Sequence, residues 1–139
     1  MTRLAMVVVL LLLAAGFVPA SSPAEGPVVP PLPTGDAARG RTIFNGLGGC
    51  ANCHGTDGYI GRRPHKSEAL TRGIARLNPQ PTDLRNPARL KAQDEAQRFV
   101  SIKFGHPGTA MYAKKNLLLD GEIMDLLAYL SVLRSEGSQ

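Results

Sequence analysis

The chain of 139 residues contains no tryptophan, only two cysteines and three histidines, and few aromatic residues of any kind (5%). Aromatic side chains this scarce leave little bulk for a core, which indicates that a bound cofactor fills part of the interior. The length allows one domain and excludes multidomain enzymes and solenoid arrays. The sequence shows neither an internal repeat nor an alternating strand pattern. Its 15 glycines and 11 prolines indicate many turns, and 16 Lys and Arg against 11 Asp and Glu give a net charge of +5.

The first 34 residues carry two patterns that we expect to lie outside the fold. Arg3 precedes an uncharged apolar run, which ends in small residues up to Ala20. This pattern is typical of a secretory signal peptide over residues 1–20, cleaved near Ala20. The run is shorter than the roughly 20 residues that a membrane span needs. Residues 21–34 are rich in proline and predict an extended linker. We therefore expect an exported protein, with membrane contact only if the signal stays uncleaved.

Residues 35–135 have helical periodicity and predict an all-α domain of about three to five helices with long loops, followed by a tail at 136–139. Asp94 begins a capping-box pattern, and Gly105 is placed to end the helix that Asp94 starts. The expected helices cover about 36–47 with Asp36 as cap, 67–77, 94–104, and 120–133 with Asp120 as cap.

The segment Cys50-Ala51-Asn52-Cys53-His54 has the C-x-x-C-H pattern of c-type haem attachment. Two thiols three residues apart project to neighbouring positions on one face of the chain, where each can add to one haem vinyl group and form a thioether. The adjacent His54 then presents its imidazole to the iron. The motif predicts one covalent haem c, attached through Cys50 and Cys53, with His54 as an iron ligand.

Three other interpretations of the two cysteines remain open. A redox dithiol usually opens a helix after a strand, and no strand is predicted here. Half of a zinc site would use His54 or His65, yet a structural zinc site normally takes four ligands, with Cys or His at paired spacing. A disulfide across so short a loop would stabilise the fold little. Covalent haem explains the motif best.

A second iron ligand must come from elsewhere in the chain. Only two methionines follow the predicted signal. Met124 falls on the last predicted helix, where ordinary packing explains it. Met111 lies in a Gly/Pro-rich loop without helical periodicity, where a soft thioether suits an axial position better than core filling. Met111 is the predicted ligand, and His106, His65 and Lys114 remain alternatives.

Taken in order, these features resemble class I (mitochondrial cytochrome c-like) monohaem c-type cytochromes of the bacterial periplasmic type, over about Asp36 to Leu133. The resemblance implies a cytochrome c fold wrapped around one covalent haem, with its first and last helices crossing closely. It also implies export to the periplasm. The matching features are Gly40 and Phe44 of the first helix, the motif Cys50, Cys53 and His54, the loop Gly105 to Met111, and the step Tyr129-Leu130 of the last helix.

The resemblance further implies that a proline carbonyl after the motif accepts a hydrogen bond from His54, which would fix its tautomer and raise its basicity. Pro64 is one candidate for that proline. The segment Asn78 to Leu84 looks more like the variant of periplasmic members, so we expect Pro79 or Pro81 to supply the carbonyl.

Iron held between His54 and Met111 has no open position, which favours outer-sphere electron transfer over oxygen chemistry. We therefore expect a one-electron carrier in a respiratory or oxidative chain, not an enzyme. Two alternatives stay open: a haem c subunit of a larger dehydrogenase or oxidase, and a five-coordinate haem protein that binds a ligand.

The charge pattern predicts the kind of partner. Lys114 and Lys115 follow Met111 closely and are expected near the haem edge, where basic side chains would steer a redox donor and acceptor with acidic docking surfaces. Nucleic acid is a poor candidate, because export removes the opportunity and the basic residues are not interleaved with aromatic ones.

Overall fold

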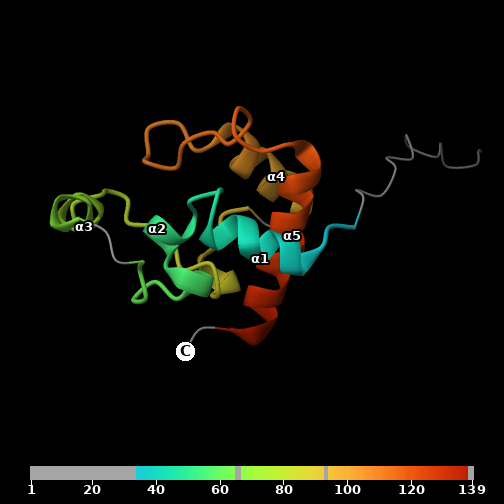
Figure 1. Ribbon diagram of the computed structural model, residues 1–139, viewed down its shortest axis with the longest axis horizontal. Helices are drawn as coiled ribbons and strands as arrows, with labels where there is room; N and C mark the ends of the chain where they lie inside the picture. The colour runs from blue at the N-terminus through green and yellow to red at the C-terminus, as the bar shows by residue number, and fades with distance from the viewer. Residues whose placement is uncertain (1–33, 65–66, 93, 138–139) are drawn as a thin grey trace, which may run out of the picture. The chain divides into compact units, whose positions relative to one another are not determined.

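The computed structural model describes residues 34–64, 67–92 and 94–137. This part of the chain is helical and contains no strands, which confirms the predicted all-α class. No helix among these residues is long and apolar enough to cross a membrane. The predicted signal peptide, and the linker up to residue 33, lie outside the described residues. The elements are α1 (Ala37–Asn45), α2 (Ala51–His54), the 3-10 turn η1 (Thr56–Gly58), α3 (Glu68–Ala75), the 3-10 turn η2 (Pro87–Arg89), α4 (Glu95–Phe104) and α5 (Asp120–Glu136) (Figure 1).

Side-chain caps explain where the first helices begin. The Asp36 carboxylate accepts hydrogen bonds from two backbone N–H groups of the first turn of α1, at 2.8 and 3.0 Å. Asp94 accepts from the backbone N–H of Gln97 at 2.7 Å and caps α4 in the same way. Each bond satisfies a donor that the helix itself leaves without a partner. At its other end, α1 stops at Asn45, before the turn that Gly46 starts.

The predicted cap of the last helix was wrong. The cap residue of α5 is Leu119, and Asp120 is the first helical residue. The Glu122 carboxylate accepts from the backbone N–H of Leu119 at 2.7 Å, while the Asp120 carboxylate pairs with Lys103 at 2.7 Å. The helix also continues through Glu136, a residue expected in the tail 136–139. Asp120 was misassigned because its partner on α4 lies 17 residues earlier in the chain.

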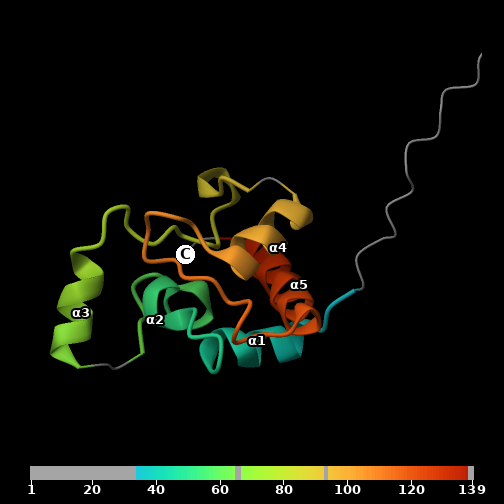
Figure 2. The ribbon, with the colours of Figure 1, turned by 90° about the horizontal axis from the view of Figure 1, so that it is seen from above.

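Helices α1 and α5 cross closely at Gly40 (Figures 1 and 2). A Cβ atom built on Gly40 would lie 2.0 Å from the backbone oxygen of Asp125 and 2.9 Å from the Cβ of Tyr129. One turn further on, the rings of Phe44 and Tyr129 meet edge to face, with centroids 5.5 Å apart. The expected approach of Gly40 to Tyr129 is therefore confirmed.

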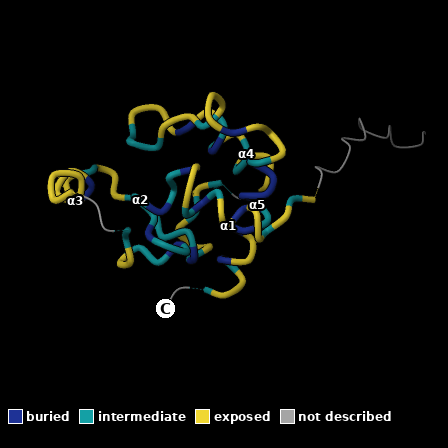
Figure 3. Tube along the Cα trace, in the orientation of Figure 1, coloured by how far each residue is buried: buried dark blue, intermediate teal, exposed yellow. Residues whose placement is uncertain are grey.

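Burial is concentrated along α5, whereas α3 is mostly exposed (Figure 3). The core consists largely of α5 side chains packed against Phe44 of α1, Ala51 of α2 and Ile102 of α4. Because α5 supplies most of the buried apolar residues, the other elements are organised around it. The buried apolar residues of α5 are Ile123, Met124, Leu126, Leu127, Tyr129, Leu130 and Leu133.

A Gly40→Ala substitution is expected to destabilise the fold. The added methyl group meets backbone rather than the end of a flexible side chain, so the helices must move apart, at a cost of about 1–3 kcal/mol. Gly73→Ala is the matched control, because a Cβ at Gly73, inside α3, meets nothing within 4 Å. That change should stabilise the protein by about 0.5–1 kcal/mol. Urea unfolding of both variants measures the difference, and equal effects would contradict the close crossing.

Candidate functional site

The two cysteines and the histidine of the C-x-x-C-H motif lie together on the one-turn helix α2. Cys50 is its cap residue, and the backbone N–H of His54 bonds to the Cys50 carbonyl at 2.9 Å. Both cysteines are partly exposed free thiols. Burial raises the pKa of the Cys50 thiol. The turn thus presents two thiols and an imidazole from neighbouring positions.

The chain reverses immediately after His54. Gly55 has φ +83°, and a Cβ at this position would lie 1.7 Å from the carbonyl oxygen of Tyr59. Only glycine adopts this conformation with so little space beside it. The backbone N–H of Gly55 also bonds to the carbonyl of Ala51 at 2.9 Å, which closes the turn of α2. The position of His54 is therefore fixed on its C-terminal side by backbone geometry.

The imidazole of His54 is oriented by a backbone carbonyl. Nδ1 of His54 donates to the carbonyl oxygen of Thr82 at 2.9 Å. A carbonyl only accepts, so Nδ1 carries the proton and Nε2 keeps a free lone pair for a metal. The predicted acceptor, the carbonyl of Pro79 or Pro81, was wrong: the bond goes to the residue after Pro81. Any residue has a backbone carbonyl, so proline in the sequence did not mark which one faces His54.

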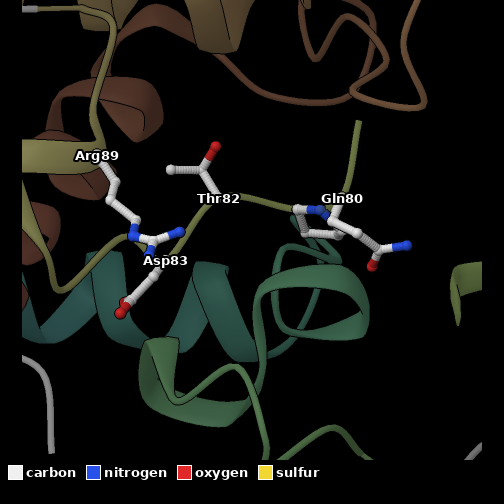
Figure 4. Close-up of a pocket in the computed structure, with 5 residues that line it drawn as sticks. Gln80, Thr82, Asp83 and Arg89 are labelled. Carbon is white, nitrogen blue, oxygen red and sulfur yellow. The ribbon is translucent and has the colours of Figure 1, made fainter. Parts of the chain in front are cut away.

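A pocket of about 330 Å³ runs along the segment that carries Thr82. Gln80, Thr82, Asp83 and Arg89 line it together with Pro81 (Figure 4). Most of these side chains are polar or charged. The pocket, which lies beside Thr82, therefore suits a polar group better than it suits the apolar face of a haem ring.

The loop that carries Met111 is held in a tight conformation by its own hydrogen bonds. The backbone N–H of His106 donates to the Met111 carbonyl at 2.9 Å. Thr109 Oγ1 accepts from the Met111 N–H at 3.1 Å and donates to the His106 carbonyl at 2.8 Å. Gly105 has φ +71°, and a Cβ there would lie 2.4 Å from the Met111 carbonyl oxygen. Met111 is thus carried on a defined backbone loop that requires glycine at its start.

This loop, between α4 and α5, returns toward α2 (Figures 1 and 2). Burial lowers the pKa of His54, the hydrogen bond to Thr82 opposes this shift, and Arg63, His106 and Lys114 lower the pKa further. The charge of Lys114 also acts on Cys50, where it opposes the effect of burial on the pKa. Two residues of the loop therefore lie within electrostatic reach of the motif. His65, an alternative ligand, lies outside the described residues.

The sequence profile of the Cytochrome c family matches residues 37–134. The chain belongs to the cytochrome c family. No curated protein matches the chain significantly. The profile covers α1 to nearly the end of α5, and so spans the motif on α2, the Thr82 segment and the Met111 loop. Members of this family are generally electron carriers.

The residues of α2 fit a covalent haem c. Cys50 and Cys53 are free thiols on one turn, and the neighbouring His54 has the tautomer that leaves Nε2 available. Among the described residues, which do not include His65, no group of three or more His, Cys, Asp and Glu side chains could hold a metal, and Cys50 and Cys53 form no disulfide with each other.

Sequence reasoning missed Asp57, which connects this site to the helix crossing. Its carboxylate accepts from the Arg41 guanidinium at 2.9 and 2.7 Å, from Asn45 at 2.8 Å and from the Tyr129 hydroxyl at 2.8 Å. Its φ of +52° is unusual for a residue with a side chain. The Asp57-Gly58 pair predicts a turn, but nothing in the sequence indicates that Asp57 bonds to side chains on α1 and α5.

The Asp57–Tyr129 contact predicts a stability optimum bounded at both ends of the pH range. The Arg41 guanidinium holds the pKa of Asp57 well below its usual value, and burial with the bond to Asp57 raises the pKa of Tyr129 to about 12. Asp57 therefore stabilises the fold above its unfolded pKa of about 3.9, and this contribution is lost as the pH falls below it. Tyr129 contributes below its unfolded pKa of about 10, and this contribution is lost as the pH rises toward 12.

Urea unfolding of the purified protein at a series of pH values measures both limits. Tyr129→Phe should remove much of the alkaline loss, and Asp57→Asn should flatten the acid loss while lowering stability at neutral pH. A Tyr129→Phe variant that loses stability above pH 10 as steeply as the wild type would contradict the assignment.

Proposed function

We propose that the protein is a class I monohaem c-type cytochrome of the bacterial periplasmic type. Cys50 and Cys53 would hold one haem c through thioethers, and His54 and Met111 would bind its iron. The protein carries single electrons in a respiratory or oxidative chain and is not itself an enzyme. The observation that carries the proposal is the bond from His54 Nδ1 to Thr82, which leaves Nε2 free to bind a metal beside two free thiols.

The chain's residues would hold this cofactor in one geometry. Haem supplies the one-electron couple between Fe(II) and Fe(III). Cys50 and Cys53 attach it covalently, and His54 is kept in a single tautomer by Thr82. Thr109 and Gly105 constrain the backbone of the Met111 loop. With His54 and Met111 as its two protein ligands, the iron would transfer electrons with little reorganisation and would have no position left for a substrate.

A basic and apolar surface next to Met111 supports docking of an acidic redox partner. Lys115 lies over the ring of Phe104, with its Nζ 5.6 Å from the ring centroid. Tyr112, directly after Met111, is 75% exposed. Lys114, which precedes Lys115 in the chain, adds a second positive charge. Basic residues around an apolar centre speed encounter with an acidic protein and allow rapid release. Donor and acceptor would meet the protein in the periplasm after cleavage near Ala20.

Expression with haem-maturation machinery tests the central claim. The purified protein should have the mass of a chain cleaved near Ala20 plus one haem, and the spectrum of a low-spin c-type cytochrome. A colourless protein with the mass of the bare polypeptide would overturn the proposal. Size-exclusion chromatography of native extract distinguishes a free carrier from a subunit of a larger dehydrogenase or oxidase.

Met111→Ala should retain covalent haem, because the thioethers are untouched. It should lower the reduction potential, abolish the weak long-wavelength band of methionine bound to Fe(III), and admit carbon monoxide to the reduced form. Met124→Leu is the matched control, since Met124 is buried on α5 and the change conserves volume. An unchanged spectrum and potential in Met111→Ala would show that another residue, such as His106, is the ligand. A wild-type protein that binds carbon monoxide readily would favour the five-coordinate alternative.

Replacing Lys114 and Lys115 together by Gln should slow reduction by an acidic redox protein by about tenfold or more at low ionic strength. The effect should shrink as salt is added, because surface charges are screened over about 8 Å at physiological ionic strength. Stopped-flow kinetics against salt concentration measure it. The double Lys→Arg variant keeps both charges and serves as the control. Equal salt dependence in wild type and the Gln variant would place docking elsewhere.

A further inference from the structure

Arg85 is a charged residue inside the fold. Its side chain is only 3% exposed, which is unusual for arginine unless its charge is compensated. Both terminal nitrogens donate to one carboxylate oxygen of Glu136, at 3.0 and 2.9 Å, and one of them also donates to the Gly137 carbonyl at 3.2 Å. Nε donates to the carbonyl oxygen of Asp57 at 3.1 Å. The guanidinium therefore ties together the end of α5 and the turn after α2.

The segment that carries Arg85 and the turn that carries Asp57 are the same two segments that meet at His54. Asp57 lies three residues after His54, and Arg85 lies three residues after Thr82. The bond from His54 to Thr82 and the bond from Arg85 to Asp57 therefore close a short ring of covalent and hydrogen bonds. The backbone N–H of Arg85 is in turn held by the Asp83 side chain at 3.0 Å. Movement of Arg85 would loosen the contact between Thr82 and His54.

We infer that Arg85 is a positioning residue that holds the Thr82 carbonyl against Nδ1 of His54, and so sets how strongly His54 donates electron density to iron. This inference rests on the proposed function. A firm bond at Nδ1 makes the imidazole more basic, which stabilises Fe(III) and lowers the reduction potential. Glu136 anchors Arg85 from α5, so the end of the last helix acts on the proximal ligand.

Replacing Arg85 should change the reduction potential in opposite directions, depending on whether the loss of its charge or the loss of its positioning role dominates. Removing a positive charge near iron favours Fe(III) and lowers the potential. Loosening the bond between His54 and Thr82 weakens donation by the imidazole and raises the potential. Arg62 offers a matched control, because its guanidinium lies over the ring of Tyr59 at 4.2 Å, the ring that Arg85 contacts at 3.9 Å. Arg62 is exposed, unlike Arg85.

The test compares Arg85→Gln with Arg62→Gln in the holoprotein. Two quantities are measured: the midpoint potential, and the solvent exchange rate of the His54 Nδ1 proton by NMR of the diamagnetic reduced form. Arg85→Gln should raise the potential and speed exchange about tenfold, the factor expected from losing one ordinary hydrogen bond. Arg62→Gln should leave exchange unchanged and leave the potential unchanged or lower. A purely structural role for Arg85 would reduce unfolding stability without moving exchange at Nδ1.

Glu136→Gln provides a second variant, because Glu136 is half exposed and its replacement is milder than that of a buried arginine. It should speed exchange of the same proton by a smaller factor. If Arg85→Gln gives no holoprotein, unchanged exchange in Glu136→Gln overturns the inference. A lower potential with unchanged exchange in Arg85→Gln also overturns it. Absence of covalent haem in the wild type would instead overturn the proposed function, so the two failures are distinct.

Discussion

The close crossing of α1 and α5 at Gly40 is the constraint on which the rest of the structure depends. With no side chain between them, the helix backbones approach until Gly40 meets the carbonyl of Asp125. This brings Phe44 into edge-to-face contact with Tyr129. The two rings supply bulk to the core of a chain that has few aromatic residues. The close approach also brings charged side chains of the two helices near enough to form ion pairs. Asp125, which is buried, accepts two bonds from Arg39 at 2.8 and 3.0 Å.

A second carboxylate, that of Asp57, connects this helix crossing to the C-x-x-C-H motif. Asp57 is bonded to Arg41 and Asn45 of α1 and to Tyr129 of α5, and it lies three residues after His54. A residue with a side chain at φ +52° is strained, so the segment needs these bonds to keep its path. The turn that ends α2 is therefore fixed by tertiary contacts as well as by Gly55.

The predictable features of this protein are those that depend on local sequence patterns. The all-α class, the caps Asp36 and Asp94, and the motif Cys50–His54 depend on residues within a few positions of one another, so periodicity and spacing identified them. The resemblance to a family added the approach of Gly40 to Tyr129. The parts that were missed depend on partners far apart in the chain. Asp120 is of a residue type that commonly caps helices, yet its carboxylate pairs with Lys103, 17 residues earlier in the chain.

The same division separates two features of the proposed haem site: how haem would be attached, and how strongly His54 would bind its iron. Attachment needs two thiols and an imidazole on one turn, so five consecutive residues suffice to specify it. Adjustment depends on which carbonyl reaches Nδ1 of His54, and that is decided by how the segment from Thr82 to Arg85 docks against Asp57 and Glu136. A backbone carbonyl has no residue-specific signature, and a proline nearby only restricts the conformation of its own segment. In the proposed cytochrome, the ligand His54 would thus be specified locally in the sequence, whereas the strength of its bond to iron would depend on the whole fold.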